Sequence, residues 1–141
     1  MKFKLIVASA LLALGLVSPA MAHPVFPVAY PTFARGWELI GARDVSFRAE
    51  RDTIPAWGRD RYSQIKICVY RQPVRMYDVD VYFHNGGHQD VGVRNVIGDG
   101  QCTRAIDLNG NRRNIRSVAL AYQSLPTFRH VDRALVRVYA R

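Results

Sequence analysis

Apolar and polar residues alternate with a period of two along much of this chain. In the segment 74–84, Val79, Val81 and Phe83 fall on one face, and Asp78, Asp80 and Tyr82 fall on the other. Such alternation is typical of β-strands that bury one face. The same pattern predicts strands at residues 37–47, 63–71, 74–84, 89–97, 101–108, 114–123 and 133–139.

Residues that favour turns separate these segments. Glycine occurs together with asparagine or aspartate, residues that tolerate positive φ, at 85–87, 98–100 and 109–110. Residues 50–62 are mostly polar and contain Pro55, so we expect a loop there. Seven or eight short strands without helical periodicity predict an all-β fold, an antiparallel β-sandwich of immunoglobulin-like or jelly-roll type.

The start of the chain has a different pattern. Lys2 and Lys4 precede an apolar run of 13 residues at 5–17, and the small residues Ala20 and Ala22 follow. A positive start, a short apolar core and small residues at the −3 and −1 positions are typical of a cleavable secretory signal. A membrane-spanning helix needs roughly 20 apolar residues, more than this run provides.

This pattern predicts three parts of the chain. We expect a signal-peptide helix at residues 1–22, a proline-rich extended lead-in at 23–36 and the β-sandwich domain at 37–141. The mature protein would begin at His23, would lack a transmembrane segment and would be periplasmic or secreted.

Charge adds a candidate binding role. Without Lys2 and Lys4 the chain carries 18 basic and 11 acidic side chains, and every one of the 18 except Lys66 is arginine. Guanidinium groups bind carboxylates and phosphates as planar forks. The excess therefore either marks a surface for anionic partners, such as an envelope glycan or a lipid headgroup, or is ordinary solvated surface.

The densest basic stretch follows the turn at 109–110 and contains Arg112, Arg113 and Arg116. We expect these three to lie together at one end of the sandwich and to bind anions. Strand alternation puts Arg112 and Arg116 on one face and Arg113 on the other, so a turn or bulge must bring Arg113 round.

Cys68 and Cys102 are the two cysteines, and in an oxidising compartment such a pair predicts a disulfide. Alternation opposes this pairing, because Cys68 falls opposite the apolar face of its strand whereas Cys102 shares the face of Ile106. A bulge would remove the conflict. Two separate buried thiols are the alternative.

The chain also resembles a group of small exported bacterial proteins that are described only as a domain of unknown function. The resemblance covers most of residues 37–141, and the matching positions are Asp52, the segment 65–67, the segment 78–86, the segment 106–110, Arg112 or Arg113, and Ile115. It implies export and a β fold, and it brings no activity with it.

Two constellations could carry chemistry. His84 and His88 flank a turn and could share a metal, with Asp90 or Asp78 as a third ligand. Asp78 and Asp80 lie about 7 Å apart at ~3.4 Å per residue along one strand face, which suits two-carboxylate hydrolysis and also calcium. The alternatives are two solvated loop histidines and a solvent-facing strand edge whose aspartates pair with neighbouring arginines.

His23, as a free N-terminus, could bind copper(II), although Pro24 removes the backbone amide that such sites often use. No serine lies in a nucleophile-elbow motif. We therefore expect no cofactor and a non-enzymatic envelope protein that binds anionic ligands through arginine-rich loops. The alternatives are a hydrolase that uses Asp78, Asp80, His84 and His88, and an inhibitor of a secreted enzyme.

Overall fold

The computed structural model describes residues 36–46, 48–58, 60–125 and 133–141. The predicted signal-peptide helix at 1–22, the cleavage site before His23 and almost all of the lead-in at 23–36 lie outside the described residues. The fold described below is therefore that of the predicted β domain.

Ten strands make up the described part of the chain. They are β1 (Glu38–Val45), β2 (Glu50–Pro55), β3 (Gln64–Tyr70), β4 (Val74–Phe83), β5 (His88–Val91), β6 (Val96–Ile97), β7 (Gln101–Cys102), β8 (Ile106–Asp107), β9 (Ile115–Ser124) and β10 (Ala134–Ala140).

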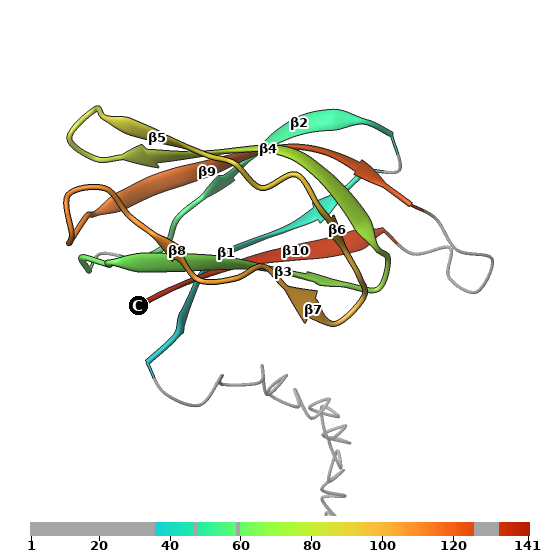
Figure 1. The fold of residues 1–141 in the computed structure, drawn as a ribbon, viewed down its shortest axis with the longest axis horizontal. Helices are drawn as coiled ribbons and strands as arrows, with labels where there is room; N and C mark the ends of the chain where they lie inside the picture. The colour runs from blue at the N-terminus through green and yellow to red at the C-terminus, as the bar shows by residue number, and fades with distance from the viewer. Residues whose placement is uncertain (1–35, 47, 59, 126–132) are drawn as a thin grey trace, which may run out of the picture. The chain divides into compact units, whose positions relative to one another are not determined.

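The strands form two antiparallel sheets that pack face to face (Figure 1). Sheet A has the order β1-β10-β3-β7, with β8 also paired to β3, and sheet B has the order β2-β9-β4-β5, with β6 also paired to β4. When the collinear pairs β5/β6 and β7/β8 are each taken as one strand, every sheet has four strands. This is the strand order of a jelly roll, so the predicted antiparallel sandwich is confirmed.

The structure differs from the predicted strands in two respects. Two expected strands, at 89–97 and 101–108, are each divided into two short segments. The expected loop at 50–62 was wrong in its first half, because Glu50–Pro55 forms β2, an edge strand beside β9. Only Ile54 of β2 is buried, so an edge strand exposed to solvent lacks the apolar alternation by which the other strands were recognised.

The core lies between the sheets, where inward residues of β4 and β9 meet those of β3 and β10. Val79, Val81 and Phe83 are at most 1% exposed, as their alternation predicted. Burying an apolar side chain of this size stabilises the fold by roughly 1.5–3 kcal/mol. Buried apolar residues of both sheets form one contiguous cluster. This cluster holds the inner faces of the two sheets together.

The Tyr122 hydroxyl is among the polar groups buried with this core. Tyr122 is 1% exposed, and its hydroxyl donates to Asp52 Oδ2 at 2.6 Å and accepts from Ser46 N at 3.0 Å. Burial, and next the hydrogen bond to Asp52, raise the pKa of Tyr122 above its usual range. The network ties the end of β1 to both β2 and β9.

The predicted disulfide between Cys68 and Cys102 is present, and a bulge brings both cysteines onto one face. Cys68 on β3 lies directly opposite Cys102 on β7, with the two Cα atoms 3.9 Å apart. Ile106 of β8 pairs with Ile65. The four residue steps from Cys102 to Ile106 therefore lie opposite the three steps from Cys68 to Ile65. The extra residue lets Ile106 face the core while Cys102 faces outward.

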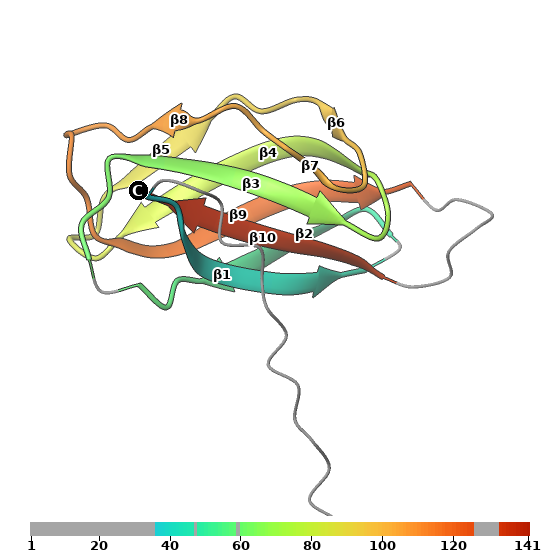
Figure 2. The same cartoon turned by 90° about the horizontal axis from the view of Figure 1, so that it is seen from below.

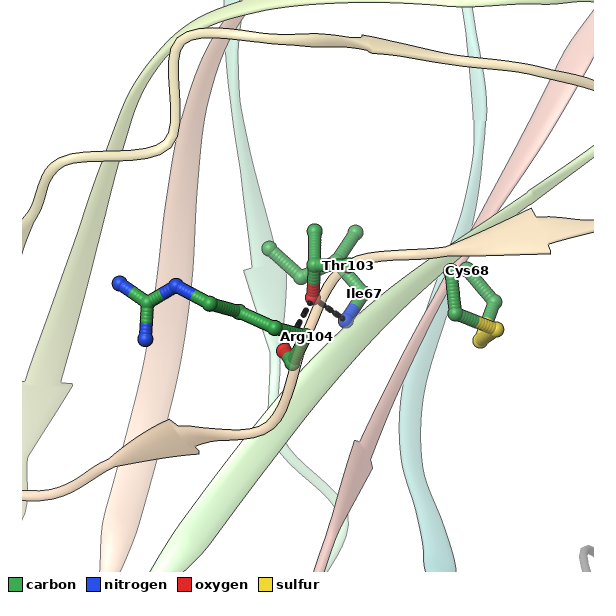
Figure 3. The surroundings of a disulfide bond; sticks show 5 residues. Ile67, Cys68, Thr103 and Arg104 are labelled. Carbon is green, nitrogen blue, oxygen red and sulfur yellow. Dashed lines mark hydrogen bonds between the residues drawn. A yellow bond between two sulfur atoms is a disulfide. The ribbon is translucent and has the colours of Figure 1, made fainter.

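Thr103 holds this irregular segment against β3. Its backbone N donates to Ile67 O at 2.8 Å, and its hydroxyl accepts from Ile67 N at 3.0 Å. Figure 3 shows the Thr103 hydroxyl turned toward Ile67 and the Arg104 side chain directed away from the disulfide. The local hydrogen bonds replace those that the regular ladder would supply.

Candidate functional site

Three connections between strands meet at the end of the sandwich where the C-terminus is marked (Figures 1 and 2). They join β2 to β3, β4 to β5, and β8 to β9. Tyr62 and Arg113 exchange two backbone hydrogen bonds, each 2.8 Å from N to O, which link the first connection to the third. His84 N donates to Asn114 O at 3.0 Å, which links the second connection to the third. Residues far apart in the sequence therefore lie side by side here.

A hollow of about 520 Å³ opens between these connections. We call it the arginine hollow, and the residues that line it are Arg61, Phe83, His84, Asn85, Arg112, Arg113 and Asn114. Three of the lining residues are arginines, and no carboxylate is among them. The arginine hollow thus combines positive charge with amide and imidazole groups that can form hydrogen bonds.

Arg113 is held in position by groups around its guanidinium. Nη1 donates to Asn109 O at 2.7 Å, Nη2 donates to Asn85 Oδ1 at 3.2 Å, and Cζ lies 3.7 Å from the centroid of the Phe83 ring. Gly110, at φ 87°, leaves the room that this side chain fills, because a Cβ there would lie 3.2 Å from Arg113 Cδ. A guanidinium ordered before binding loses less entropy when it meets an anion.

Arg61 and Arg112 are exposed and lie close together. Arg112 Nη2 is 3.4 Å from Arg61 O, to which it donates. Among the described residues, neither side chain forms an ion pair with a carboxylate. Arginines that line one hollow and have no ion-pair partner favour a bound anion. The buried Oδ1 of Asn114 also has no hydrogen-bond partner in the described structure.

A second hollow of about 610 Å³ adjoins the first and shares Arg61 and Arg112 with it. We call it the mixed hollow, and the residues that line it are Gly36, Glu38, Asp60, Arg61, Tyr62, Arg112, Ala140 and Arg141. Three arginines and two acidic residues are among them. The charge is therefore more nearly balanced than in the arginine hollow.

Tyr62 fixes one of those carboxylates, since its hydroxyl donates to Glu38 Oε2 at 3.0 Å. Burial, and next the hydrogen bond to Glu38, raise the pKa of Tyr62 to about 12. The phenol therefore remains a donor at any physiological pH. Arg141 is positioned in turn by Gln64, whose Oε1 accepts from Nε at 2.7 Å, and by the Trp37 ring, 4.7 Å away.

The three arginines predicted to bind anions do not all meet. Arg112 and Arg113 line the arginine hollow, but Arg116 does not. Tyr82 pairs with Ser117 and Phe83 with Ile115, so Arg116 lies in a bulge of β9. Its Cζ lies 5.8 Å from the centroid of the Tyr82 ring on the outer face of sheet B. Arg113 is held at the end of the sandwich by its isolated pairing with Tyr62.

Asp78 and Asp80, the predicted hydrolytic pair, share one face of β4, and both form ion pairs with the same arginine. Arg51 Nη2 lies 3.0 Å from Asp78 Oδ2, and Nη1 lies 3.8 Å from Asp80 Oδ2. Arg51 reaches them from β2 across β9, where Ala119 and Ala121 leave space. The sequence suggested cross-strand arginines as partners, with Arg75, Arg94 and Arg104 as the candidates, but the arginine that pairs is Arg51.

His84 and His88 lie on opposite sides of the β4–β5 turn. His84 lines the arginine hollow, whereas the ring of His88 stacks on Tyr82 with centroids 5.7 Å apart. Within the described ranges, no group of three or more His, Cys, Asp or Glu side chains could hold a metal ion. The copper site suggested at His23 lies outside the described residues.

Several residues of the two hollows were not recognised in the sequence. Arg61 and Asp60 belong to a polar stretch without a motif, and Arg141 is isolated near the end of β10. Asn85 was assigned only to a turn. A pattern of period two indicates which face a residue takes but not which loops meet at the end of a sandwich, so the sequence offered no signal for them.

The chain belongs to the family described as a domain of unknown function (DUF2541), which matches residues 6–140. No curated protein matches the sequence. A solved structure of Pseudomonas aeruginosa AlgX is similar at 10% identity with a TM-score of 0.45, over 74% of this chain and 26% of that one. The chain thus spans about a quarter of that protein, and a likeness at this level says nothing of function. In the described ranges, no helix has the length and apolar character needed to cross a membrane.

Proposed function

We propose that this domain is a non-enzymatic binding protein that holds the anionic group of a cell-envelope glycan in the arginine hollow. The observation that supports this proposal is the convergence of Arg61, Arg112 and Arg113 on one hollow without a lining carboxylate. Guanidinium groups donate paired hydrogen bonds to carboxylate, sulfate or phosphate oxygens. Export, as part of the proposal, rests on the signal pattern, and a secreted chain that begins at His23 by mass spectrometry would support it.

A glycan suits this site better than a lipid surface. The arginines surround a hollow at the end of the sandwich, and Arg113 is partly buried against Phe83. A charged unit of a soluble chain can enter such a hollow. Adsorption to a bilayer needs a basic face with apolar side chains beside it, and the lining of the arginine hollow contains one apolar residue, the buried Phe83.

The decisive experiment compares charge removal inside and outside the hollow. Isothermal titration with oligogalacturonate would measure the wild type, the double variant Arg61→Gln/Arg112→Gln and the single variant Arg94→Gln. Arg94 is exposed and lines neither hollow. Each hydrogen bond to a charged group contributes about 1.5–3 kcal/mol, so we expect the double variant to bind at least about tenfold more weakly. Its affinity should also depend less on salt.

Arg94→Gln should bind nearly as the wild type does. Equal affinities of the double variant and Arg94→Gln, with both folded, would overturn the proposal. Vesicles that contain phosphatidylglycerol form a second arm of the experiment. Binding to the vesicles without binding to oligogalacturonate would identify a lipid headgroup in place of a glycan.

A further inference from the structure

The two hollows share a wall but differ in charge. Arg61 and Arg112 line both, so a ligand unit in one hollow adjoins a unit in the other. The arginine hollow has no lining carboxylate, whereas Glu38 and Asp60 line the mixed hollow. A linear ligand that crosses the shared wall therefore passes from a positive environment to one that also contains negative charge.

From this asymmetry we infer the class of ligand, an inference that rests on the proposed function. The ligand is an acidic oligosaccharide in which a charged unit is followed by a neutral, hydroxyl-rich unit. The charged unit occupies the arginine hollow, and the neutral unit occupies the mixed hollow.

Hydrogen-bond chemistry accounts for this order. The carboxylates of Glu38 and Asp60 accept hydrogen bonds from hydroxyl groups, whereas they repel a second carboxylate, sulfate or phosphate. Glu38 is oriented by the Tyr62 hydroxyl at 3.0 Å, so one acceptor is in place before the ligand arrives. Arg61 and Arg112 can donate to ligand oxygens on either side of the shared wall.

The dimensions of the site agree with two units. The hollows measure about 520 and 610 Å³, and each lies within the range of roughly 300–1,000 Å³ that is common for small-molecule sites. A continuous polyanion, such as a chain in which every unit is charged, would place one of its charges beside Asp60. The site thus selects against uniform negative charge while it attracts an anion.

Two oligosaccharides of equal length test the inference. Hyaluronan hexasaccharide alternates a carboxylate unit with a neutral unit, and hexagalacturonate carries a carboxylate on every unit. At matched ionic strength, we expect wild-type protein to bind the hyaluronan fragment at least threefold more tightly, although it has half the charge. Asp60→Asn should bring the two affinities closer together, because it removes the repulsion. Asp90→Asn, an exposed acid that lines neither hollow, is the matched control and should leave the ratio unchanged.

The outcomes separate this inference from the proposed function. Equal or tighter binding of hexagalacturonate by the wild type would overturn the inference, and so would an unchanged ratio in Asp60→Asn. If Arg61→Gln/Arg112→Gln then weakens binding of both oligosaccharides, the proposed function still stands. If that double variant alters neither affinity, the proposed function fails as well. Absence of binding to both would overturn the inference and the proposed glycan ligand together, and binding to the vesicles would then identify a lipid headgroup instead.

Discussion

Arginine is used differently in two regions of this molecule. On the outer face of sheet B, Arg51 lies between two carboxylates, 3.0 Å from Asp78 and 3.8 Å from Asp80. At the end of the sandwich, Arg61 and Arg112 form no ion pair with a described carboxylate. Strand register places opposite charges in fixed rows on a sheet, whereas loops at the end have no such rows. A count of basic residues therefore says little about binding until their neighbours are known.

This comparison predicts that stability and binding are separable. Substitutions within the sheets should lower the free energy of unfolding and leave anion binding intact. Substitutions of the arginines in the hollow should do the reverse.

The largest loss of stability should follow removal of the disulfide. Cys68→Ala/Cys102→Ala opens a loop whose ends are 34 residues apart, and loop-closure entropy predicts a loss of about 3–4 kcal/mol. Chemical denaturation measures the loss. Wild-type protein in reducing buffer serves as the control and should lose a similar amount. A loss below about 1 kcal/mol, or weaker binding of oligogalacturonate by the folded variant, would contradict the separation.

Tyr122→Phe should have an intermediate effect. It removes the hydroxyl that bonds to Asp52 and Ser46 inside the core, and an unsatisfied buried partner costs about 1–3 kcal/mol. Denaturation measures this loss, and titration with oligogalacturonate should show no change. Tyr77→Phe is the matched control, since Tyr77 is 42% exposed and its hydroxyl donates to Gln123 at the surface.

The pH dependence of stability gives a second test of the role of the Tyr122 hydroxyl. The pKa of Tyr122 is raised by burial, so the folded protein keeps this proton where the unfolded chain, with a pKa near 10, has lost it. The stability linked to this proton is fully present below pH 10 and declines as the pH rises further. The free energy of unfolding of Tyr122→Phe should therefore fall less steeply above pH 10 than that of the wild type. An identical alkaline slope in both proteins would show that this hydroxyl does not titrate with unfolding.

The smallest effects distinguish the two sets of arginines most directly. Arg51→Gln breaks the two ion pairs of an exposed arginine and should cost less than about 1 kcal/mol, with unchanged binding. Arg112→Gln should alter stability by no more than about 0.5 kcal/mol and should weaken binding. Denaturation measures the free energy of unfolding of each variant, and titration measures its affinity for oligogalacturonate. If Arg51→Gln weakened binding as much as Arg112→Gln, total charge would govern affinity and the hollow would have no special role.

The fold class could be predicted because alternation encodes which face of a strand is buried. Val79, Val81 and Phe83 face the core as expected, and the same reasoning located β3, β9 and β10. Strand β2 escaped recognition because an edge strand with one buried residue, Ile54, has little alternation to show. Pro55 at its end added to the loop-like character.

The sequence by itself determined the sandwich, its principal strands and a chain with a large excess of arginine. Only the tertiary structure decided that a bulge turns Cys102 toward Cys68, that another bulge takes Arg116 away from the end, and that Arg61 lies beside Arg112. The physical reason is the range of the interactions. Alternation and turn chemistry act between near neighbours in the sequence, whereas register, bulges and the meeting of loops depend on how two distant strands pack.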